Sequence, residues 1–204
     1  MRGRFIVFEG IDGAGKTTQI ERLAERLRAE GRRVAITAEP TGSVTGKMLR
    51  EALSGRDPRT ASEMAALFVL DRINHNVGEG GIEQMLAEGI DVICDRYYYS
   101  SLAYQGSQTD FEWVKAMNLN CPEIRTPDIC IFLDLEPKES LARIHARNIS
   151  TEIYENEEIL EAVRSRFLEV FASTGDNVAI IHAADTIDAV AERVYQAFSA
   201  QMKA

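Results

Sequence analysis

The chain has 204 residues, of which 45% are hydrophobic and 27% charged, a composition typical of a globular protein with one sizeable core. Its net charge of −9 argues against non-specific binding of nucleic acid, so bound phosphates would need a local cluster of cationic groups. No apolar run is long enough for a signal peptide or a membrane span, and we expect one cytoplasmic domain over residues 1–204. The three cysteines and three histidines show no metal-ligand spacing, so no zinc site is expected.

A glycine-rich motif follows the first predicted strand. Residues 5–8 are an apolar run, Gly10–Thr17 fits the P-loop pattern G-x-x-x-x-G-K-[ST], and apolar residues at helical spacing begin at Ile20. Such a loop turns successive backbone N–H groups toward phosphate oxygens, while Lys16 can reach the outer phosphates and Thr17 can ligate Mg²⁺. The alternative is an ordinary glycine turn before a helix, which the complete motif in this setting disfavours.

The second predicted strand covers residues 34–37 and ends at a turn-forming stretch, residues 39–43. A helix is expected to follow over roughly 44–54. The apolar residues of this helix that we expect to face inward are Val44, Met48 and Leu53.

Residues 60–89 have the apolar spacing of one long helix or of two joined end to end, and the glycines within 78–81 favour a break. Phe68 and Arg72 lie four residues apart in this segment, so they share a helix face. Core packing is the commoner role of such a phenylalanine. The functional alternative is an aromatic plate for a nucleotide base, with Arg72 beside it.

Two charged residues follow the third predicted strand, residues 90–94, directly. A carboxylate in the place of Asp95 can hold Mg²⁺ or its water, and Arg96 can clamp a phosphate with two parallel hydrogen bonds. The alternative is a surface ion pair at the end of a strand. The P-loop on the same side of the predicted sheet favours the functional interpretation.

The rest of the chain continues the alternation of helix and strand. The later expected elements are a mainly helical stretch at 98–121, a strand at 129–133, a helix from Pro137, a helix over 157–173, a strand at 178–181 and a helix from about 185. Five short apolar strands alternating with helices indicate an α/β fold, a doubly wound five-stranded parallel sheet covered on both faces. Ligands of such sheets bind at the carboxyl ends of the strands, which places the Gly10 loop, Glu39 and Asp95–Arg96 on one rim.

Arg143 and Arg147 are four residues apart, so they share a helix face. Glu139 stands four residues before Arg143, and one interpretation is therefore a solvated salt-bridge face. The polar stretch 148–156 favours another, in which a lid at about 147–157 closes over the transferring phosphates and its arginines neutralise their charge.

Three stretches resemble the thymidylate kinase family, and with Pro127–Asp128 and Leu133–Asp134 the resemblance runs along nearly the whole chain. Glu9–Gln19 resembles the opening of the family, and Leu67–Arg72 resembles its base-stacking helix. Residues 95–105 resemble its D-R-Y-x-x-S-S-x-A-Y-Q stretch, the most specific of the three. The resemblance implies a P-loop NTPase fold of the nucleoside monophosphate kinase type. It also implies a homodimer that transfers the γ-phosphate of MgATP to dTMP in dTTP biosynthesis.

The resemblance also implies roles for individual residues. The residues expected to bind ATP are Gly10, Ile11, Asp12, Gly13, Ala14, Gly15, Lys16, Thr17, Thr18 and Arg143. Those expected to bind dTMP are Asp12, Glu39, Phe68, Arg72, Arg96, Ser100, Ser101, Tyr104 and Gln105. The expected catalytic residues are Lys16, Arg96, Arg147 and Asp12, and the expected Mg²⁺ ligands are Thr17 and Asp95. Phe68 would stack on thymine, and Tyr104 would disfavour a ribose 2′-hydroxyl.

Three positions distinguish this chain from family members with other patterns. Gly13 stands where one branch has a P-loop arginine, so the chain resembles the branch whose catalytic arginine lies in the lid. Ala38 replaces the arginine of the usual Arg-Glu-Pro-Gly-Gly-Thr stretch, and Lys47 stands where an acidic residue is common.

Two other functions are compatible with a P-loop. One is a kinase for another nucleotide or deoxynucleoside. The other is a nucleotide-binding switch that transfers no phosphate to a small molecule, which the predicted acceptor residues Phe68, Arg72 and Tyr104 disfavour.

Overall fold

A parallel β-sheet forms the centre of the molecule. The computed structural model describes residues 2–146 and 157–201, and within them five strands pair in the order β2-β3-β1-β4-β5, each parallel to its neighbours. The strands are β1 Phe5–Glu9, β2 Val34–Ala38, β3 Asp91–Asp95, β4 Ile129–Asp134 and β5 Val178–His182. The predicted doubly wound parallel sheet is confirmed, with strand ends that differ by about one residue from those expected.

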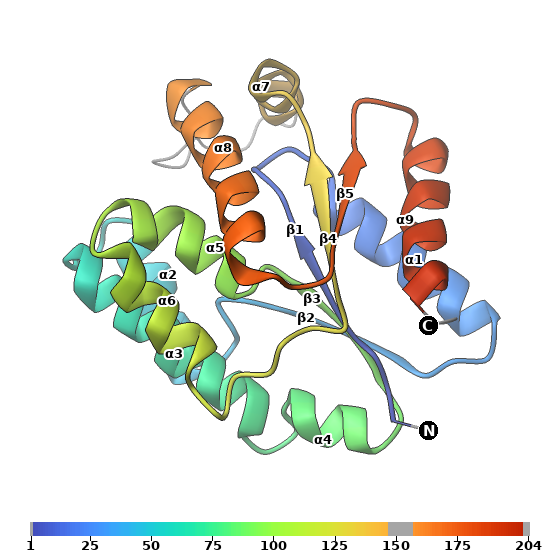
Figure 1. Cartoon of the computed structure of the whole chain (residues 1–204), viewed down its shortest axis with the longest axis horizontal. Coiled ribbons are helices and arrows are strands. Elements are labelled where there is room, and N and C mark those ends of the chain that lie inside the picture. The colour runs from blue at the N-terminus through green and yellow to red at the C-terminus, as the bar shows by residue number, and fades with distance from the viewer. Residues whose placement is uncertain (1, 147–156, 202–204) are drawn as a thin grey trace.

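Helices cover both faces of this sheet (Figure 1). Helices α1 (Lys16–Ala29) and α9 (Ile187–Gln201) lie side by side on one face, and α5 (Tyr98–Tyr104) packs with α8 (Glu157–Thr174) on the other. The remaining helices are α2 Val44–Leu53, α3 Ala61–Val77, α4 Ile82–Ala87, the 3₁₀ turn η1 Gln105–Ser107, α6 Phe111–Leu119 and α7 Pro137–Ala146. Because every connection crosses over the sheet, the carboxyl ends of all strands meet at one rim.

Burial along the sheet falls from its centre to its edges. Residues 5–9 of β1 are fully buried, as expected for a strand that is covered on both faces and paired on both sides. Ile36 of β2 and Ile180 of β5 are 44% and 53% exposed, respectively. The two edge strands are thus covered less completely than the central strands, in a sheet that carries helices on both faces as predicted (Figure 1).

The helix breaks follow local capping chemistry. The predicted 60–89 segment contains two helices, because α3 ends at Val77, with Gly78 as its C-cap, and α4 starts after Gly81. The Ser43 side chain accepts a hydrogen bond from the N–H of Gly46 and so fixes the start of α2. This start leaves Val44 in the first turn at 76% exposure, so the prediction that Val44 faces inward was wrong. Leu49 is the fully buried apolar residue of α2 instead.

Residues 147–156, which include Arg147 and most of the predicted lid, lie outside the described residues. Glu157, the last residue of the predicted lid, begins α8.

Candidate active site

The P-loop motif forms a tight turn between β1 and α1. Gly13 and Gly15 have φ angles of 78° and 94°, a left-handed conformation that glycine adopts without strain. A Cβ atom on Gly13 would lie 2.7 Å from the carbonyl oxygen of Ser140 in α7, so this position excludes a side chain for a second reason. Gly15 is the N-cap of α1, and the first N–H groups of that helix point into the loop with the positive end of its dipole.

Lys16 is buried at the centre of this loop. Its ammonium donates hydrogen bonds to the carbonyl oxygens of Gly10 and Ile11, at 3.0 and 3.2 Å, and lies 3.8 Å from the carboxylate of Asp12. Burial and the nearby charge of Arg96 lower the pKa of Lys16 below its ordinary value. The loop itself therefore holds the cation in place at a position where phosphate oxygens can replace the carbonyl groups.

Arg96 joins the P-loop to the end of β3. Its guanidinium donates to the Asp12 carboxylate at 2.5 Å and to the Ser100 hydroxyl at 3.1 Å. Burial opposes ionisation of Asp12, but Arg96 and Lys16 together hold the pKa of that carboxyl below its usual range. The backbone of Arg96 has a φ of 65°, an uncommon left-handed conformation for a residue with a side chain, and such strain concentrates at functional sites.

A cavity of about 240 Å³ opens between these groups at the carboxyl rim of the sheet. Its lining residues are Asp12, Gly13, Gly15, Lys16, Thr17, Thr18, Ala38, Glu39, Asp95 and Arg96. The carboxyl ends of β1, β2 and β3 and the segments after them thus surround one cavity. Lys16, Arg96 and the first N–H groups of α1 lie at this cavity and can bind an anion. Ala38 lines one corner of the cavity with a methyl group and supplies no cation there.

The donors at this cavity fit a nucleotide-bound Mg²⁺. The Oδ1 atom of Asp95 is buried and makes no hydrogen bond to the described residues, and the hydroxyl-bearing Thr17 lines the same cavity. The described residues hold no cluster of three or more His, Cys, Asp or Glu side chains that could bind a metal by themselves. Mg²⁺ typically binds one or two protein oxygens together with substrate phosphates and water, and this donor set matches that pattern.

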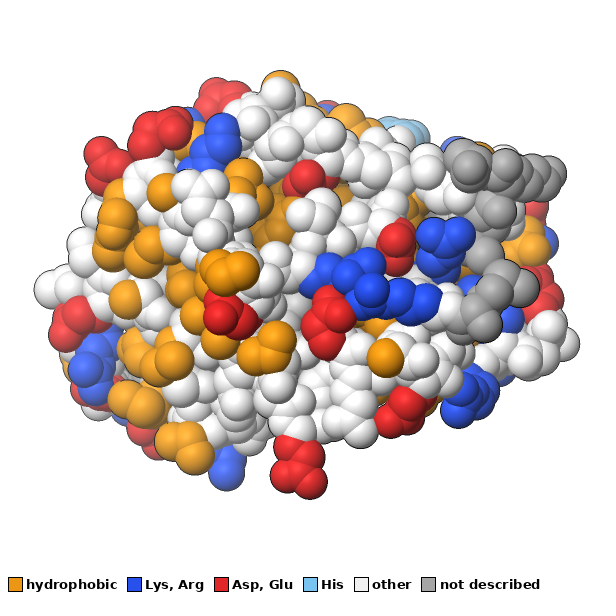
Figure 2. Space-filling model, turned by 60° about the horizontal axis from the view of Figure 1, so that its bottom comes forward, with side chains coloured by type: hydrophobic (Ala, Val, Ile, Leu, Met, Phe, Trp, Pro, Cys, Tyr) orange, Lys and Arg blue, Asp and Glu red, His pale blue; other side chains and the backbone are white. Residues whose placement is uncertain are grey.

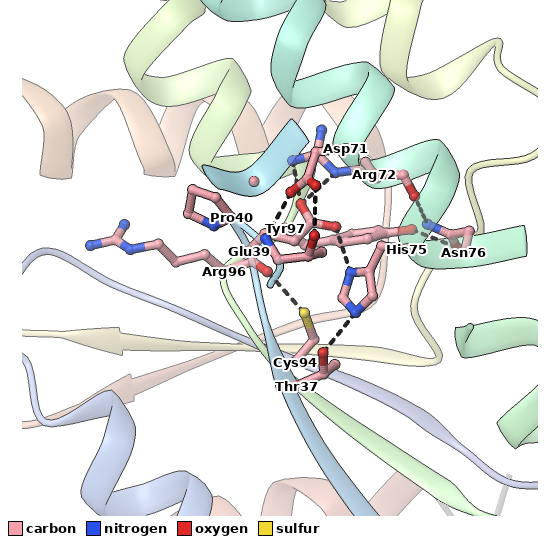
Figure 3. A network of polar contacts seen from close by, with 12 residues as sticks. Thr37, Glu39, Pro40, Asp71, Arg72, His75, Asn76, Cys94, Arg96 and Tyr97 are labelled. Carbon is pink, nitrogen blue, oxygen red and sulfur yellow. Dashed lines mark hydrogen bonds and ion pairs between the residues drawn. The ribbon is translucent and has the colours of Figure 1, made fainter. Parts of the chain in front are cut away.

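Behind the cavity, the carboxylate of Glu39 is held by α3 (Figure 3). Arg72 is 1% exposed and donates from Nε to Glu39 Oε2 at 2.9 Å, while His75 Nδ1 lies 3.0 Å from Glu39 Oε1. The guanidinium of Arg72 also bonds to the side chains of Asn118 and Ser101. Arg72 therefore joins α3, α5 and α6 around the end of β2, as a buried cation that is fully engaged by polar groups.

The other expected acceptor residues lie on α3, α5 and the turn after it. Phe68 is half-buried, one helical turn before Arg72, while Ser101, Tyr104 and Gln105 are buried. The guanidinium carbon of Arg96 lies 5.6 Å from the centre of the Tyr104 ring. Burial raises the pKa of Tyr104 to about 12, so its hydroxyl stays protonated at neutral pH.

Helix α7 packs against the P-loop through Ser140 and Ile144. The Ser140 hydroxyl donates to the carbonyl oxygen of Asp12, and Arg143 donates to the carbonyl oxygen of Ala183 at 3.0 Å. A terminal nitrogen of Arg143 lies 3.9 Å from the position that a Cβ atom on Gly15 would occupy. Arg143 therefore lies half-buried between the P-loop and the turn after β5, rather than on a solvated helix face.

Some residues around the site were not among the predicted site residues. They include Glu9, His75, Asn118 and Ser140, each buried and hydrogen-bonded to a predicted site residue or to its backbone. Glu9 offered a signal, since it is a carboxylate at the end of an apolar strand beside the P-loop. His75 offered another, at seven residues from Phe68 and three from Arg72, which places all three on one helix face.

Comparison with known proteins gives consistent matches. The family model described as thymidylate kinase matches residues 8–194. A probable thymidylate kinase of Pyrococcus horikoshii is 41% identical over 194 residues, which cover 92% of each chain. A thymidylate kinase of Solidesulfovibrio magneticus is 37% identical over 203 residues, covering 94% of this chain and 96% of the relative. A probable thymidylate kinase of Methanococcus aeolicus is 42% identical over 168 residues, covering 82% of this chain and 79% of the relative.

Proposed function

The chain belongs to the thymidylate kinase family, and we propose that the cavity at the carboxyl rim of its sheet is the place where ATP phosphorylates dTMP. The protein is an ATP:dTMP phosphotransferase, a nucleoside monophosphate kinase. The observation that carries the assignment of the site is the convergence of Lys16, Arg96, Asp95 and the first turn of α1 on one cavity.

The reaction needs positioning and charge neutralisation more than covalent chemistry. A phosphate oxygen of dTMP forms a bond to the γ-phosphorus of ATP while the bond from that phosphorus to the β–γ bridging oxygen breaks, and ADP leaves. Lys16 and the N–H groups of the P-loop would hold the ATP phosphates. Arg96, freed from Asp12 by the incoming substrate, would hold the acceptor phosphate.

Mg²⁺ would be held by Thr17 and, directly or through water, by Asp95, whose buried oxygen supports this role. When bound, the ion would neutralise charge on the phosphates during transfer. Arg143 would lie along the ATP, since it reaches from α7 to Gly15 and Ala183. Arg147, four residues further along the chain, would supply positive charge from the proposed lid to the transferring phosphoryl group.

On the acceptor side, Phe68 would stack on thymine, and Ser101, Tyr104 and Gln105 would enclose the nucleoside. Ser100 would brace Arg96, to which it is already bonded. The contact of Arg72 with Ser101 supports a position of its charge at the border of the proposed pocket, while its other bonds hold Glu39 and Asn118. Glu39 would lie near the sugar 3′-hydroxyl and the acceptor phosphate.

Assays of ADP release with different acceptors test this function against a kinase for another nucleotide. We expect turnover with dTMP to exceed turnover with dUMP, dCMP, dGMP and AMP. Lys16→Ala should lower kcat by orders of magnitude, because the lysine acts on the transferring phosphate. Faster turnover of another acceptor would identify that nucleotide as the substrate. Slow ATP hydrolysis that no monophosphate stimulates would instead favour a nucleotide-binding switch that transfers no phosphate to a small molecule.

A homodimer is the assembly that the family resemblance implies, and an apolar surface on α3 and α6 supports it. Leu70 and Val77 of α3 are 51% and 52% exposed, and Trp113 of the neighbouring α6 is 40% exposed. Figure 2 shows hydrophobic side chains gathered on the side of the molecule where these two helices lie in Figure 1. A two-fold contact of this surface with its copy would bury these side chains.

Among the described residues, no helix is long and apolar enough to cross a bilayer. We propose a cytoplasmic location for the enzyme, in keeping with ATP as its co-substrate.

A further inference from the structure

His75 is a buried histidine that the mechanism above does not use. Its side chain is 8% exposed, whereas His145 and His182 are exposed. Its spacing from Phe68 and Arg72 along α3 puts the three residues on one helix face. Arg72 and His75 on this face point toward the end of β2 (Figure 3). A histidine in this position borders the acceptor side of the site without lining the cavity itself.

Both nitrogens of the His75 ring have polar partners (Figure 3). Nδ1 lies 3.0 Å from Glu39 Oε1, and Nε2 lies 2.7 Å from the hydroxyl of Thr37. An ionised carboxylate can only accept a hydrogen bond, so Nδ1 donates to Glu39. The Thr37 hydroxyl can then donate to Nε2 of a neutral ring, which keeps the proton on Nδ1. Thr37 and His75 thus form a chain that ends on one oxygen of Glu39.

This chain controls the direction of the Glu39 carboxylate. Arg72 holds Oε2 from one side at 2.6 Å and His75 holds Oε1 from the other, so the carboxylate cannot turn. Glu39 borders the same cavity as Lys16 and Arg96. A Glu39 carboxylate released on the side of His75 could turn toward Arg96 and compete with the acceptor phosphate for its guanidinium.

We propose that His75 is a positioning residue for the acceptor phosphate. With Thr37 behind it, His75 holds the Glu39 carboxylate on Arg72, which keeps this carboxylate from competing with the monophosphate for Arg96. The proposal rests on the proposed function of Arg96 and Glu39. It predicts an effect on dTMP that ATP, held on the P-loop side, does not share.

The test compares His75→Phe, His75→Gln, Thr37→Val and the double variant Thr37→Val/His75→Phe with the wild type. His75→Phe should raise KM for dTMP roughly tenfold, the scale of losing a hydrogen bond to a charged group, with KM for ATP changed less than about twofold. His75→Gln, which keeps an N–H donor, should recover part of the affinity. The Thr37→Val effect should disappear in the His75→Phe background, because the hydroxyl then has no ring nitrogen to orient. Glu25→Gln, at an exposed position of α1 outside the site and the outer face of α3, is the control.

Several outcomes would overturn the proposal. They are equal changes of KM for both substrates, a lowered melting temperature with unchanged kinetics, no rescue by glutamine, and additive effects of Thr37 and His75. If His75→Phe does not fold, the KM of Thr37→Val for dTMP decides, and a value equal to that of the wild type refutes the proposal. Absence of dTMP turnover by the wild type would refute the proposed function instead. In that case dTMP binding by calorimetry still compares the variants.

Discussion

Among individual residues, Glu9 shows how strongly a buried carboxylate can depend on its surroundings. It is fully buried at the end of β1, where its Oε1 accepts hydrogen bonds from the backbone N–H groups of Tyr97 and Ser100. Its Oε2 lies 2.7 Å from the Ser100 hydroxyl, which in turn bonds Arg96. Burial raises the pKa of Glu9 to about 7, although Arg96 and the hydrogen bonds from Ser100 and Tyr97 oppose this rise.

The raised pKa of Glu9 predicts a pH-dependent stability of the nucleotide-free protein. Between its ordinary pKa of about 4.5 and its folded value of about 7, the folded protein keeps a proton that the unfolded chain releases. The free energy of unfolding should therefore fall as pH rises through this window, by on the order of 3 kcal/mol. Glu9→Gln, which imitates the protonated acid, should lack this loss and gain melting temperature relative to wild type between pH 5 and pH 8.

Thermal melts of both proteins across that pH range measure the effect. Glu21→Gln removes an exposed carboxylate of α1 and serves as the control, with a melting curve parallel to that of the wild type. Parallel curves for Glu9→Gln as well would show that Glu9 is already ionised throughout the window.

Phe68 predicts a separate effect on the acceptor. Loss of a base-stacking ring costs roughly 1–3 kcal/mol, so Phe68→Ala should weaken dTMP binding tenfold or more and change ATP binding little. Calorimetric titration of each nucleotide measures both affinities. Phe111→Ala removes a half-buried ring of α6 outside the site and is the control. Equal losses of affinity for dTMP and ATP in Phe68→Ala would show that Phe68 packs in the core and does not stack on the base.

Between elements, the contact of α7 with the P-loop decides which residues the loop accepts. The Ser140 backbone and the Ile144 side chain crowd the space beside Gly13, and the Ser140 hydroxyl bonds the Asp12 carbonyl. Any side chain at Gly13, an arginine included, would have to push α7 aside. The close approach of α7 thus leaves no room for a P-loop arginine at position 13. The same helix precedes residues 147–156 in the chain.

This packing predicts that Gly13→Ala impairs both stability and ATP binding. Gly31→Ala provides a matched control, because Gly31 has a similar φ of 83° but no atom within 4 Å of the added Cβ. We expect Gly31→Ala to lose about 1–2 kcal/mol of stability from backbone strain alone and to keep its kcat. Gly13→Ala should lose more stability and at least tenfold in ATP affinity. Denaturant melts and ATP titration compare them, and identical losses would mean that α7 moves aside freely.

For the whole molecule, the two faces of α3 have different tasks. Phe68, Arg72 and His75 face the site, whereas Leu70 and Val77, seven residues apart, are half exposed on the outer surface. If the proposed dimer uses this outer surface, substrate binding and assembly depend on the same helix. Disruption of the interface should then also weaken the acceptor site.

The double variant Leu70→Glu/Val77→Glu tests the dimer. Light scattering after gel filtration should show the wild type at twice the chain mass of 22.7 kDa and the variant at the single mass. Paired glutamates at the two-fold contact would repel one another in a desolvated interface. Ile180→Glu, at a 53% exposed position on β5, should remain dimeric. A wild type that is monomeric at micromolar concentration would remove the dimer from the proposal.

The sequence by itself determined the α/β architecture, the parallel sheet and the central position of the P-loop. Those features depend on local patterns, namely apolar runs, helical spacing and glycines that punctuate turns, which act over a few residues. The break between α3 and α4 was among the alternatives for the same reason, since Gly78 and Gly81 flank it. The family resemblance added the substrate, because its motifs occur at matching positions along the chain.

Only the tertiary structure decided which polar residues hold one another in place. Glu9 and Ser100 are 91 positions apart, Glu39 and His75 are 36 apart, and Ser140 lies 128 positions from Asp12. Such pairs form because crossover connections bring the carboxyl ends of parallel strands together, and no local pattern encodes which partner will meet which. The exposure of Val44 was misjudged for the same reason, since burial depends on what the rest of the chain leaves uncovered.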